Sequence, residues 1–546
     1  MSVAAIATRS SPDRITAPLL AVSDAIAAIL LAADLLVVCV SVLARFLFNA
    51  PVEWSDDVAR GLMVGSSFFG AASALARSEN LGVAFFVDML PQAVRRVVDA
   101  AGALLVTIIA GTVAFNAVKM GWLTTGQTSG SGLPLEWTFY PMGIGAAFMT
   151  VFAFETFCGR PLRDMLAGIV ATAVVAGIYL AWDAFAPSSV PSSQTLMLIG
   201  FFLTLFGGLP IGFALALAAL IFIWVEGTLP GVIFAQQMAR GIDNFVLLAI
   251  PFFILVGYLM EANGMSTRLI ELLLRLMGRM RGGLNLISIV ATALFSGISG
   301  SKLADIAAVS GIIMPAVRRT RQDPNDAAGL LACTAVMAET IPPCVNLIIF
   351  AFVANISVGG LFMAGIVPAV LLALCLSTVA IVYGRRIDPR EAFPARRSLP
   401  RLIGGSLVAL VMVMMIGRGV TAGVATSTEI SAFAVVYALV VGGLAFRELT
   451  LRSVVKLLVN AASMAGGILF IMSAASGFAF ALTIEQIPSA MSDMLVSFGH
   501  THGSLAFMVL ATLLMVVFGA VLEGAPALII FGPLLTPIAA QLGINP

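Results

Sequence analysis

Residues 284–316 read LNLISIVATALFSGISGSKLADIAAVSGIIMPA, an apolar stretch that the polar segment SGISGS interrupts at Ser296–Ser301. As helices, the two arms of about 12 residues would each span about 18 Å, less than the roughly 30 Å of a bilayer's hydrocarbon core. Both flanks are rich in arginine, which favours the cytoplasmic side of a membrane. The stretch therefore predicts a helical hairpin that enters the membrane and returns; one long tilted helix with a Gly/Ser kink is the alternative.

The composition of the whole chain indicates the same environment. Of its 546 residues, 60% are hydrophobic and 10% are charged, against about 25% charged in an average soluble protein. A soluble fold cannot bury so much apolar surface, so the lipid bilayer must act as solvent. With apolar runs long enough for spanning helices, we expect an all-α polytopic membrane protein. A cytosolic enzyme, a secreted disulfide scaffold and a disordered regulator are excluded. The net charge of +1 and the lack of a basic stripe argue against a nucleic-acid partner.

The sequence carries no motif typical of catalysis or of a resident metal. We find no HExxH, GxSxG or Walker pattern, and no CxxC or Cys/His cluster. We therefore expect no enzyme activity and no cofactor. Five cysteines (Cys39, Cys158, Cys333, Cys344, Cys375) fall in apolar stretches, where we expect small buried hydrophobic side chains.

Hydrophobic runs and polar links divide the chain into five parts. We expect four helices in residues 1–163, the first at the apolar run 17–44, which is too long for a signal peptide. Two arginines precede this run and predict a cytoplasmic N-terminus. Residues 164–194 form a connecting helix and a Pro/Ser-rich linker. Residues 195–385 and 402–546 are two further hydrophobic parts, joined at 386–401 by a basic link that we expect in the cytoplasm.

These two hydrophobic parts look like repeats of each other, at an offset of about 220 residues. Phe213-Ala214 falls on Phe433-Ala434, and Ala291-Thr292 on Ala511-Thr512. The mate of the first hairpin is 504–538, interrupted at Glu523-Gly524. Because no Lys or Arg occurs after residue 456, its ends should face outward. Two hairpins that enter from opposite sides are what an inverted-topology repeat requires.

A second interruption, AETIPPCVN at Ala338–Asn346, follows the first hairpin inside a long apolar run. Pro342 and Pro343 lack backbone donors, so the carbonyls of Ala338, Glu339 and Ile341 need other partners. In hydrocarbon such a break persists only against protein, water or an ion. Carbonyl and hydroxyl oxygens are ligands suited to Na⁺. A plain proline kink in a packed bundle is the alternative.

Polar and ionisable residues at the interruptions are candidates for a substrate or ion pathway, because such groups in membrane segments are costly and usually functional or paired. Lys302 can pair locally with Asp305, which we favour, or with Glu339 across the hairpin–helix contact. The candidates are Lys302, Asp305, Glu339, Thr340, Asn346, Glu523 and Gly524.

Several of these motifs together resemble the membrane subunits of TRAP (tripartite ATP-independent periplasmic) transporters. Residues 249–368, with LFSGISGSKLAD, ETIPP and ISVGGLFMAGIVP, and residues 426–439, TSTEISAFAVVYAL, are similar to the large subunit. Residues 44–96, with ARFLFN, EWSDDVAR, NLGV and FFVDMLP, resemble the small subunit. The resemblance covers nearly the whole chain as a fusion of the two.

The resemblance implies an inverted-repeat, elevator-type transporter with re-entrant hairpins, preceded by a small-subunit helical domain, in the bacterial inner membrane. It implies import of an organic acid anion, a carboxylate, by sodium symport, with Na⁺ as coupling ion and a periplasmic binding protein as partner. The first sodium site of the family falls on hydroxyls of Ser299 and of Ser296 or Ser301, with carbonyls of Ala338, Ile341 and Pro343.

Two alternatives to this function stay open at this point: a sodium-coupled carboxylate transporter that works without a binding protein, and a membrane-embedded enzyme. The repeat also leads to an expectation about length. The first repeat continues to about residue 385, so its offset places the matching end of the second well beyond Pro546. We expect this chain to be a truncated version of a longer protein, or not to transport as it stands.

Overall fold

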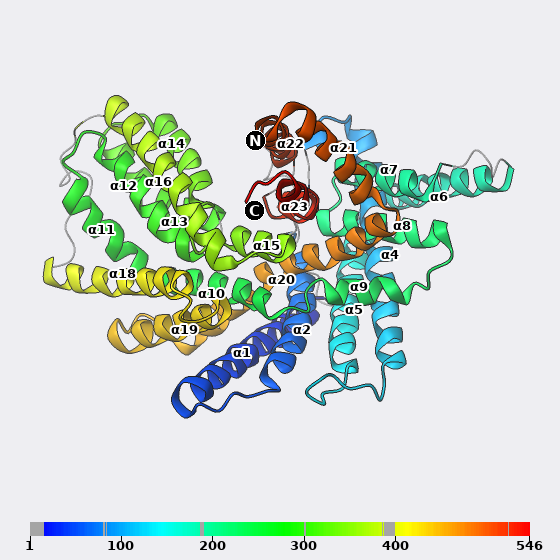
Figure 1. Cartoon of the computed structure of the whole chain (residues 1–546), viewed down its shortest axis with the longest axis horizontal. Helices are drawn as coiled ribbons and strands as arrows, with labels where there is room; N and C mark the ends of the chain where they lie inside the picture. Colours follow the sequence, from blue (N-terminus) through cyan, green and yellow to red (C-terminus); the bar gives the residue numbers. More distant parts are fainter. Residues whose placement is uncertain are drawn as a thin grey trace. The chain divides into compact units, whose positions relative to one another are not determined.

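The structure, a computed structural model, describes residues 16–79, 82, 85–185, 191–299, 302–384, 386, 399–521 and 524–545. All regular structure in these residues is helical, with isolated bridges only between Gly82 and Pro210 and between Thr128 and Pro134. Eleven helices among them are long and apolar enough to cross a membrane. The prediction of an all-helical polytopic membrane protein is confirmed (Figure 1).

The eleven helices share mean hydropathies typical of membrane spans. They are α1 (Thr16–Phe48), α2 (Ser55–Ala76), α4 (Gln92–Leu123), α5 (Glu136–Cys158), α6 (Leu162–Phe185), α10 (Ala249–Ala262) with the preceding 3-10 turn η3 (Phe245–Leu248), α16 (Val358–Tyr383), α18 (Leu399–Thr421), α19 (Ser427–Val440) with the π-helical turn η4 (Val441–Ala445), α20 (Leu451–Ile484) and α23 (Gly524–Gln541).

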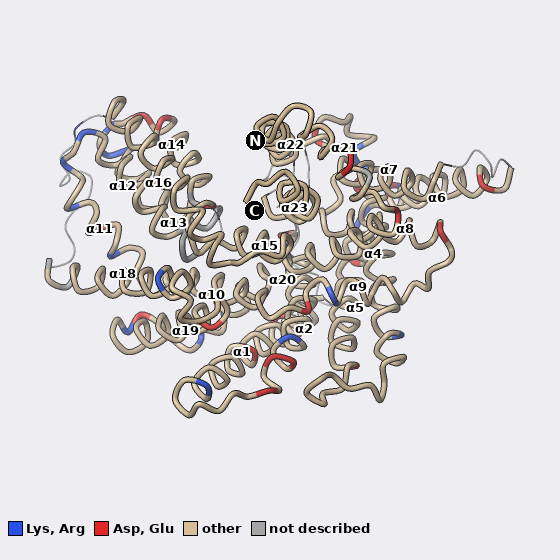
Figure 2. The backbone as a smooth tube through the Cα atoms, in the orientation of Figure 1, with Lys and Arg blue, Asp and Glu red and all other residues tan. Residues whose placement is uncertain are grey.

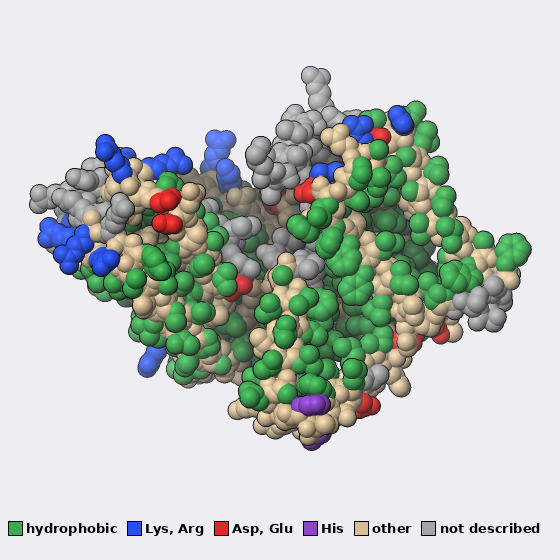
Figure 3. All heavy atoms as spheres, turned by 90° about the horizontal axis from the view of Figure 1, so that it is seen from above, with side chains coloured by type: hydrophobic (Ala, Val, Ile, Leu, Met, Phe, Trp, Pro, Cys, Tyr) green, Lys and Arg blue, Asp and Glu red, His purple; other side chains and the backbone are tan. Residues whose placement is uncertain are grey.

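The remaining described helices are shorter or more polar. They are α3 (Phe85–Asp88), α7 (Ser193–Phe206), α8 (Ile211–Glu226), α9 (Val232–Arg240), α11 (Met265–Met277), α12 (Gly283–Ser299), α13 (Lys302–Arg319), α14 (Pro324–Ala338), α15 (Val345–Ala354), α21 (Ile487–His502) and α22 (Ser504–Val521). Charged residues are sparse along the helices (Figure 2), and hydrophobic side chains cover much of the face seen in Figure 3.

The chain folds into two compact units. Unit 1 comprises the described residues of Met1–Val37, Val52–Asn244 and Ala462–Pro546, and unit 2 those of Val38–Pro51 and Phe245–Ala461. Each unit thus combines segments that are far apart in the sequence.

Small residues bring the helices of unit 1 close together. In unit 1, α4 packs against α5, α6 and α9, while α2 packs against α5. Gly145 of α5 faces the backbone of Phe68 and Phe69 in α2. Gly70 of α2 and Gly466 of α20 also meet: a Cβ atom on Gly466 would lie 2.6 Å from the carbonyl carbon of Gly70. Such close backbone approach is how membrane helices gain packing energy without a hydrophobic driving force.

Unit 2 is arranged around α10 and α12. Helix α10 packs against α19, and α12 packs against α11, α13, α14 and α16. A buried cluster of Leu286, Ile289, Met337 and Ala380 joins α12, α14 and α16. The first interrupted stretch is therefore held by neighbours on several sides.

The expectation that the cysteines are buried is wrong for three of the five. Only Cys344 is buried; Cys39 is half-buried, and Cys158, Cys333 and Cys375 are exposed on the protein surface. An apolar position in a membrane helix can face lipid as readily as protein, because lipid tails are as apolar as the protein interior.

Candidate functional site

The stretch 284–316 corresponds to two helices, α12 and α13. Helix α12 ends at Ser299 and α13 begins at Lys302. The two helices pack against each other and both pack against α14, as the arms of a hairpin do. The side chains at the tip, residues 296–305, lie outside the described part of the structure.

The second interruption separates α14, which ends at Ala338, from α15, which begins at Val345. In a continuous helix the carbonyls of Ala338 and Glu339 would accept from residues 342 and 343. Both of these are prolines and carry no N–H, and the peptide bond between them is cis. Because the two prolines lack N–H groups, the carbonyls of Ala338 and Glu339 cannot make these two helical hydrogen bonds.

Side chains across this break tie its two ends together. The amide Nδ2 of Asn346 donates to Oε1 of Glu339 at 2.9 Å, and Oγ1 of Thr340 donates to the carbonyl of Met337 at 2.7 Å. Three sequence-predicted candidates, Glu339, Thr340 and Asn346, are thus brought together in one polar turn.

The break is also packed against the hairpin and against α16. The side chain of Ile341 lies against the buried cluster that contains Leu286 and Ile289 of α12. On the other side, a Cβ atom on Gly365 of α16 would lie 2.6 Å from the carbonyl oxygen of Thr340. The hairpin arm and α16 therefore fix where the backbone of the break lies.

The structure places the other predicted residues as follows. Three helix ends carry residues whose side chains are not described: Ser296 and Ser299 at the end of α12, Lys302 and Asp305 at the start of α13, and Ala338 at the end of α14. Ile341 and Pro343 lie in the break, and Gly524 begins α23. Ser301 and Glu523 lie outside the described residues. Of those that the structure describes, Gly524 belongs to unit 1 and the others to unit 2. Their roles as ligands stay predictions.

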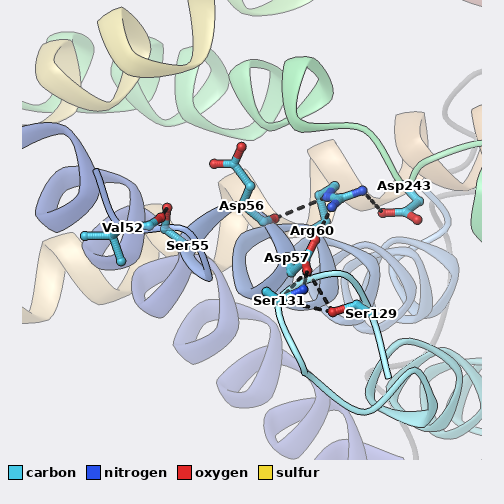
Figure 4. Close-up of polar contacts among 8 residues, drawn as sticks. All are labelled: Val52, Ser55, Asp56, Asp57, Arg60, Ser129, Ser131 and Asp243. Atoms are coloured by element: carbon cyan, nitrogen blue, oxygen red, sulfur yellow. Dashed lines mark hydrogen bonds and ion pairs between the residues drawn. The ribbon is translucent and has the colours of Figure 1, made fainter. Parts of the chain in front are cut away.

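Sequence reasoning did not identify a second polar group, which lies in unit 1. Asp57 of α2 accepts hydrogen bonds from the hydroxyls of Ser129 (2.7 Å) and Ser131 and from the backbone N–H of Ser131 (3.3 Å), and it pairs with Arg60. Arg60 also contacts Asp243 at 3.4 Å. Figure 4 shows Arg60 between the two carboxylates, with Asp56 pointing away. Only the i,i+3 spacing of Asp57 and Arg60 could have indicated it.

Comparison with known proteins agrees with this architecture. The family model for the DctM component of tripartite ATP-independent periplasmic transporters matches residues 198–546, and the model for the DctQ component matches residues 34–163. The match to the DctM component alone covers more than half of the chain.

Named relatives show the same relationship. The chain is 34% identical to the 2,3-diketo-L-gulonate TRAP transporter large permease protein of Escherichia coli, over 62% of this chain and 80% of the relative. It is 28% identical to the isethionate TRAP transporter permease protein of Oleidesulfovibrio alaskensis, over 91% of this chain and 78% of the relative. It is 26% identical to the sialic acid TRAP transporter permease protein of Haemophilus influenzae, over 92% of this chain and 84% of the relative.

These matches confirm the family that the sequence motifs indicated, with the small-subunit and large-subunit components in one chain. They identify a transporter permease rather than an enzyme. With eleven apolar helices of spanning length, it is a multi-pass protein of the bacterial inner membrane. The chain belongs to the family of tripartite ATP-independent periplasmic transporters, as a fusion of its two membrane components.

Proposed function

We propose that this protein imports an organic acid anion by sodium symport and receives its solute from a periplasmic binding protein. The observation that carries the proposal is the proline-interrupted break at 339–344, which packs against the hairpin arm α12 within unit 2. Backbone that leaves its helix at membrane depth is tolerated where it lines a site for solute or ion.

The solute class is supported by the names of the relatives. Diketo-gulonate, isethionate and sialic acid are the solutes in the three names, and each carries a carboxylate or sulfonate group. The shared chemistry is a small organic anion. A carboxylate is the class that we propose for this chain.

Sodium coupling is supported by the donor set at the break. Carbonyl oxygens freed by Pro342 and Pro343 and the hydroxyls of the hairpin tip are hard oxygen ligands of the kind that Na⁺ takes in transporter breaks. In this proposal Ser299, with Ser296 or Ser301, faces the carbonyls of Ala338, Ile341 and Pro343.

The first experiment is solute uptake into proteoliposomes. A panel of carboxylic acids is offered outside, each with a periplasmic binding protein loaded with it, under an inward Na⁺ gradient or with K⁺ in its place. We expect uptake only with Na⁺ and binding protein together. Equal uptake in K⁺ would overturn sodium symport, and equal uptake of the free acid would overturn dependence on the binding protein.

The second experiment tests the break without needing the solute. Changing both prolines to alanine, Pro342→Ala with Pro343→Ala, restores two N–H donors to the freed carbonyls. Binding of radioactive ²²Na⁺ to the purified protein should weaken at least about tenfold, which is about 1.4 kcal/mol. The matched control is Pro368→Ala, which removes a proline inside α16 and changes no residue of the break itself. Equal Na⁺ affinity in all three proteins would contradict the proposed site.

A further inference from the structure

A cavity of about 590 Å³ lies inside unit 1, and no residue of the two interrupted stretches lines it. Its walls come from α1 through Leu30, from α2 between Asp57 and Gly65, from the loop at 129–135 and from the start of α5. Cavities of about 300–1,000 Å³ with a few convergent polar groups are the usual form of small-molecule sites. None of its residues belongs to the sodium site proposed above.

Most of the residues that line this cavity are apolar. They include Leu30, Leu62, Leu133, Leu135 and Pro141, with the rings of Trp137 and Tyr140. Water does not fill an apolar space of this kind, because it would lose hydrogen bonds there. The natural occupant beside these residues is a hydrocarbon chain.

The lining also contains the polar group of Asp57, Arg60, Ser129 and Asp243, whose contacts Figure 4 shows. The two carboxylates and one guanidinium sum to a formal charge of −1, which disfavours a purely anionic ligand. Asp57 already accepts from both serines and Arg60, and its side chain is only 17% exposed. Asp243 is 42% exposed and has one long contact of 3.4 Å, so it can accept from a cationic donor.

The depth of the cavity relative to the bilayer is indicated by tryptophan. Trp54, Trp122 and Trp137 are all largely exposed, just before α2, at the end of α4 and at the start of α5. Exposed Trp residues typically mark the level of the lipid headgroups. Along α2 the lining runs from Asp57 to Gly65, about 12 Å at 1.5 Å per residue, from that level toward the hydrocarbon.

We propose that this cavity binds a bilayer phospholipid with a primary ammonium headgroup, phosphatidylethanolamine. One acyl chain packs against the apolar residues. The ammonium donates to the Asp243 carboxylate, and the phosphate faces the Arg60 guanidinium, whose side chain is 33% exposed. A zwitterionic headgroup matches one accessible carboxylate beside one accessible guanidinium. The transported anion would meet a net negative site.

Filling the cavity provides the main test. Gly61 lines the cavity, and a Cβ atom there would meet nothing within 4 Å, so Gly61→Leu adds a side chain to the cavity wall without a clash at Cβ. The matched control is Gly177→Leu on the exposed face of α6, where a Cβ atom also meets nothing within 4 Å. A second variant, Asp243→Asn, changes a half-exposed group and removes the charge that the ammonium needs.

The measurement is native mass spectrometry of the purified protein, titrated with phosphatidylethanolamine, phosphatidylcholine or phosphatidylglycerol in separate samples. We expect the original protein and Gly177→Leu to retain phosphatidylethanolamine at least about tenfold more tightly than Gly61→Leu, which is about 1.4 kcal/mol. Asp243→Asn should lose the preference for phosphatidylethanolamine over phosphatidylcholine. Equal retention by the two leucine variants, or a preference for phosphatidylglycerol, would overturn the proposal. No transport readout is involved, so the result is independent of the proposed function.

Discussion

Asp34 lies in α1 with its side chain fully buried, and neither carboxylate oxygen has a hydrogen-bond partner among the described residues. Asp24, ten residues earlier in the same helix, has a partner. Its Oδ2 accepts a hydrogen bond at 2.5 Å from Arg77, the residue that follows α2. Burial of a polar group without a partner lowers stability, whereas a buried group with its partner does so far less. The two acids should therefore respond in opposite ways to removal.

We predict that Asp34→Leu stabilises the protein by about 1–3 kcal/mol, the cost of an unsatisfied buried polar group. Asp24→Leu should destabilise it, because Arg77 would lose its ion pair. Thermal midpoints of the purified proteins, followed by tryptophan fluorescence, give the comparison. A lower midpoint for Asp34→Leu than for the original protein would mean that Asp34 has a partner or a role that its surroundings do not reveal.

At this scale the sequence predicted neither the polar groups of unit 1 nor their partners. Asp24 and Asp34 are the two acids within the first apolar run, but Arg77 is 53 positions from Asp24. Likewise Asp57 meets Ser129 and Ser131, which lie 72 and 74 positions away on a loop. Such pairs depend on how helices pack, and spacing within one helix carries no information on that.

Among the helices, the crossing of α2 and α20 depends on two glycines. A Cβ atom on Gly466 would lie 2.5 Å from the backbone nitrogen of Ala71 and 2.6 Å from the carbonyl carbon of Gly70. Backbone atoms cannot rotate aside as a flexible side chain can. The neighbouring Gly467 differs, since a Cβ atom there would meet only the Cβ of Ala74, at 3.9 Å.

We predict that Gly466→Ala lowers stability by about 1–3 kcal/mol through overpacking, while Gly467→Ala leaves it nearly unchanged. Thermal midpoints of the two purified variants test this directly, and each variant adds one methyl group to the same helix. Similar midpoints for both would show that α2 and α20 do not approach at Gly70.

Helices of spanning length were the most predictable elements. The apolar run 17–44 corresponds to α1, Thr16–Phe48, because in lipid a chain must pair its own backbone groups. The division of residues 195–262 into short helices was not predictable in the same way. There the helices end at turns such as Gly207–Pro210, which an overall hydrophobic run conceals.

For the whole molecule, the distribution of arginine implies an orientation in the membrane. Arginines lie near one end of these helices: Arg77 follows α2, Arg95 and Arg96 lie near the start of α4, and Arg160 follows α5. The loop at 124–135 between α4 and α5 has no Lys or Arg. By the positive-inside rule, the start of α4 faces the cytoplasm and its end faces the periplasm.

We predict that a cysteine at Gln127→Cys, in a background with the five native cysteines replaced by alanine, reacts with a membrane-impermeant maleimide in intact cells. A cysteine at Gln92→Cys, at the other end of α4, should react only after the membrane is permeabilised. Both positions are exposed. Labelling of Gln92→Cys alone in intact cells would reverse the orientation.

Unit 1 joins segments that are made at very different times. Ser463 of α20 accepts a hydrogen bond from Arg77, which lies 386 positions earlier. Glu485 accepts a hydrogen bond from Ser193, which lies 292 positions earlier. At 5–20 residues per second, about 20–80 s of translation separate α2 from α20. Through that interval the face of α2 that carries Gly70 has no protein partner from α20. The nascent small-subunit helices must therefore persist in the bilayer before α20 packs against them. Because α20 is translated late, the contact between α2 and α20 is one of the last contacts of the fold to form.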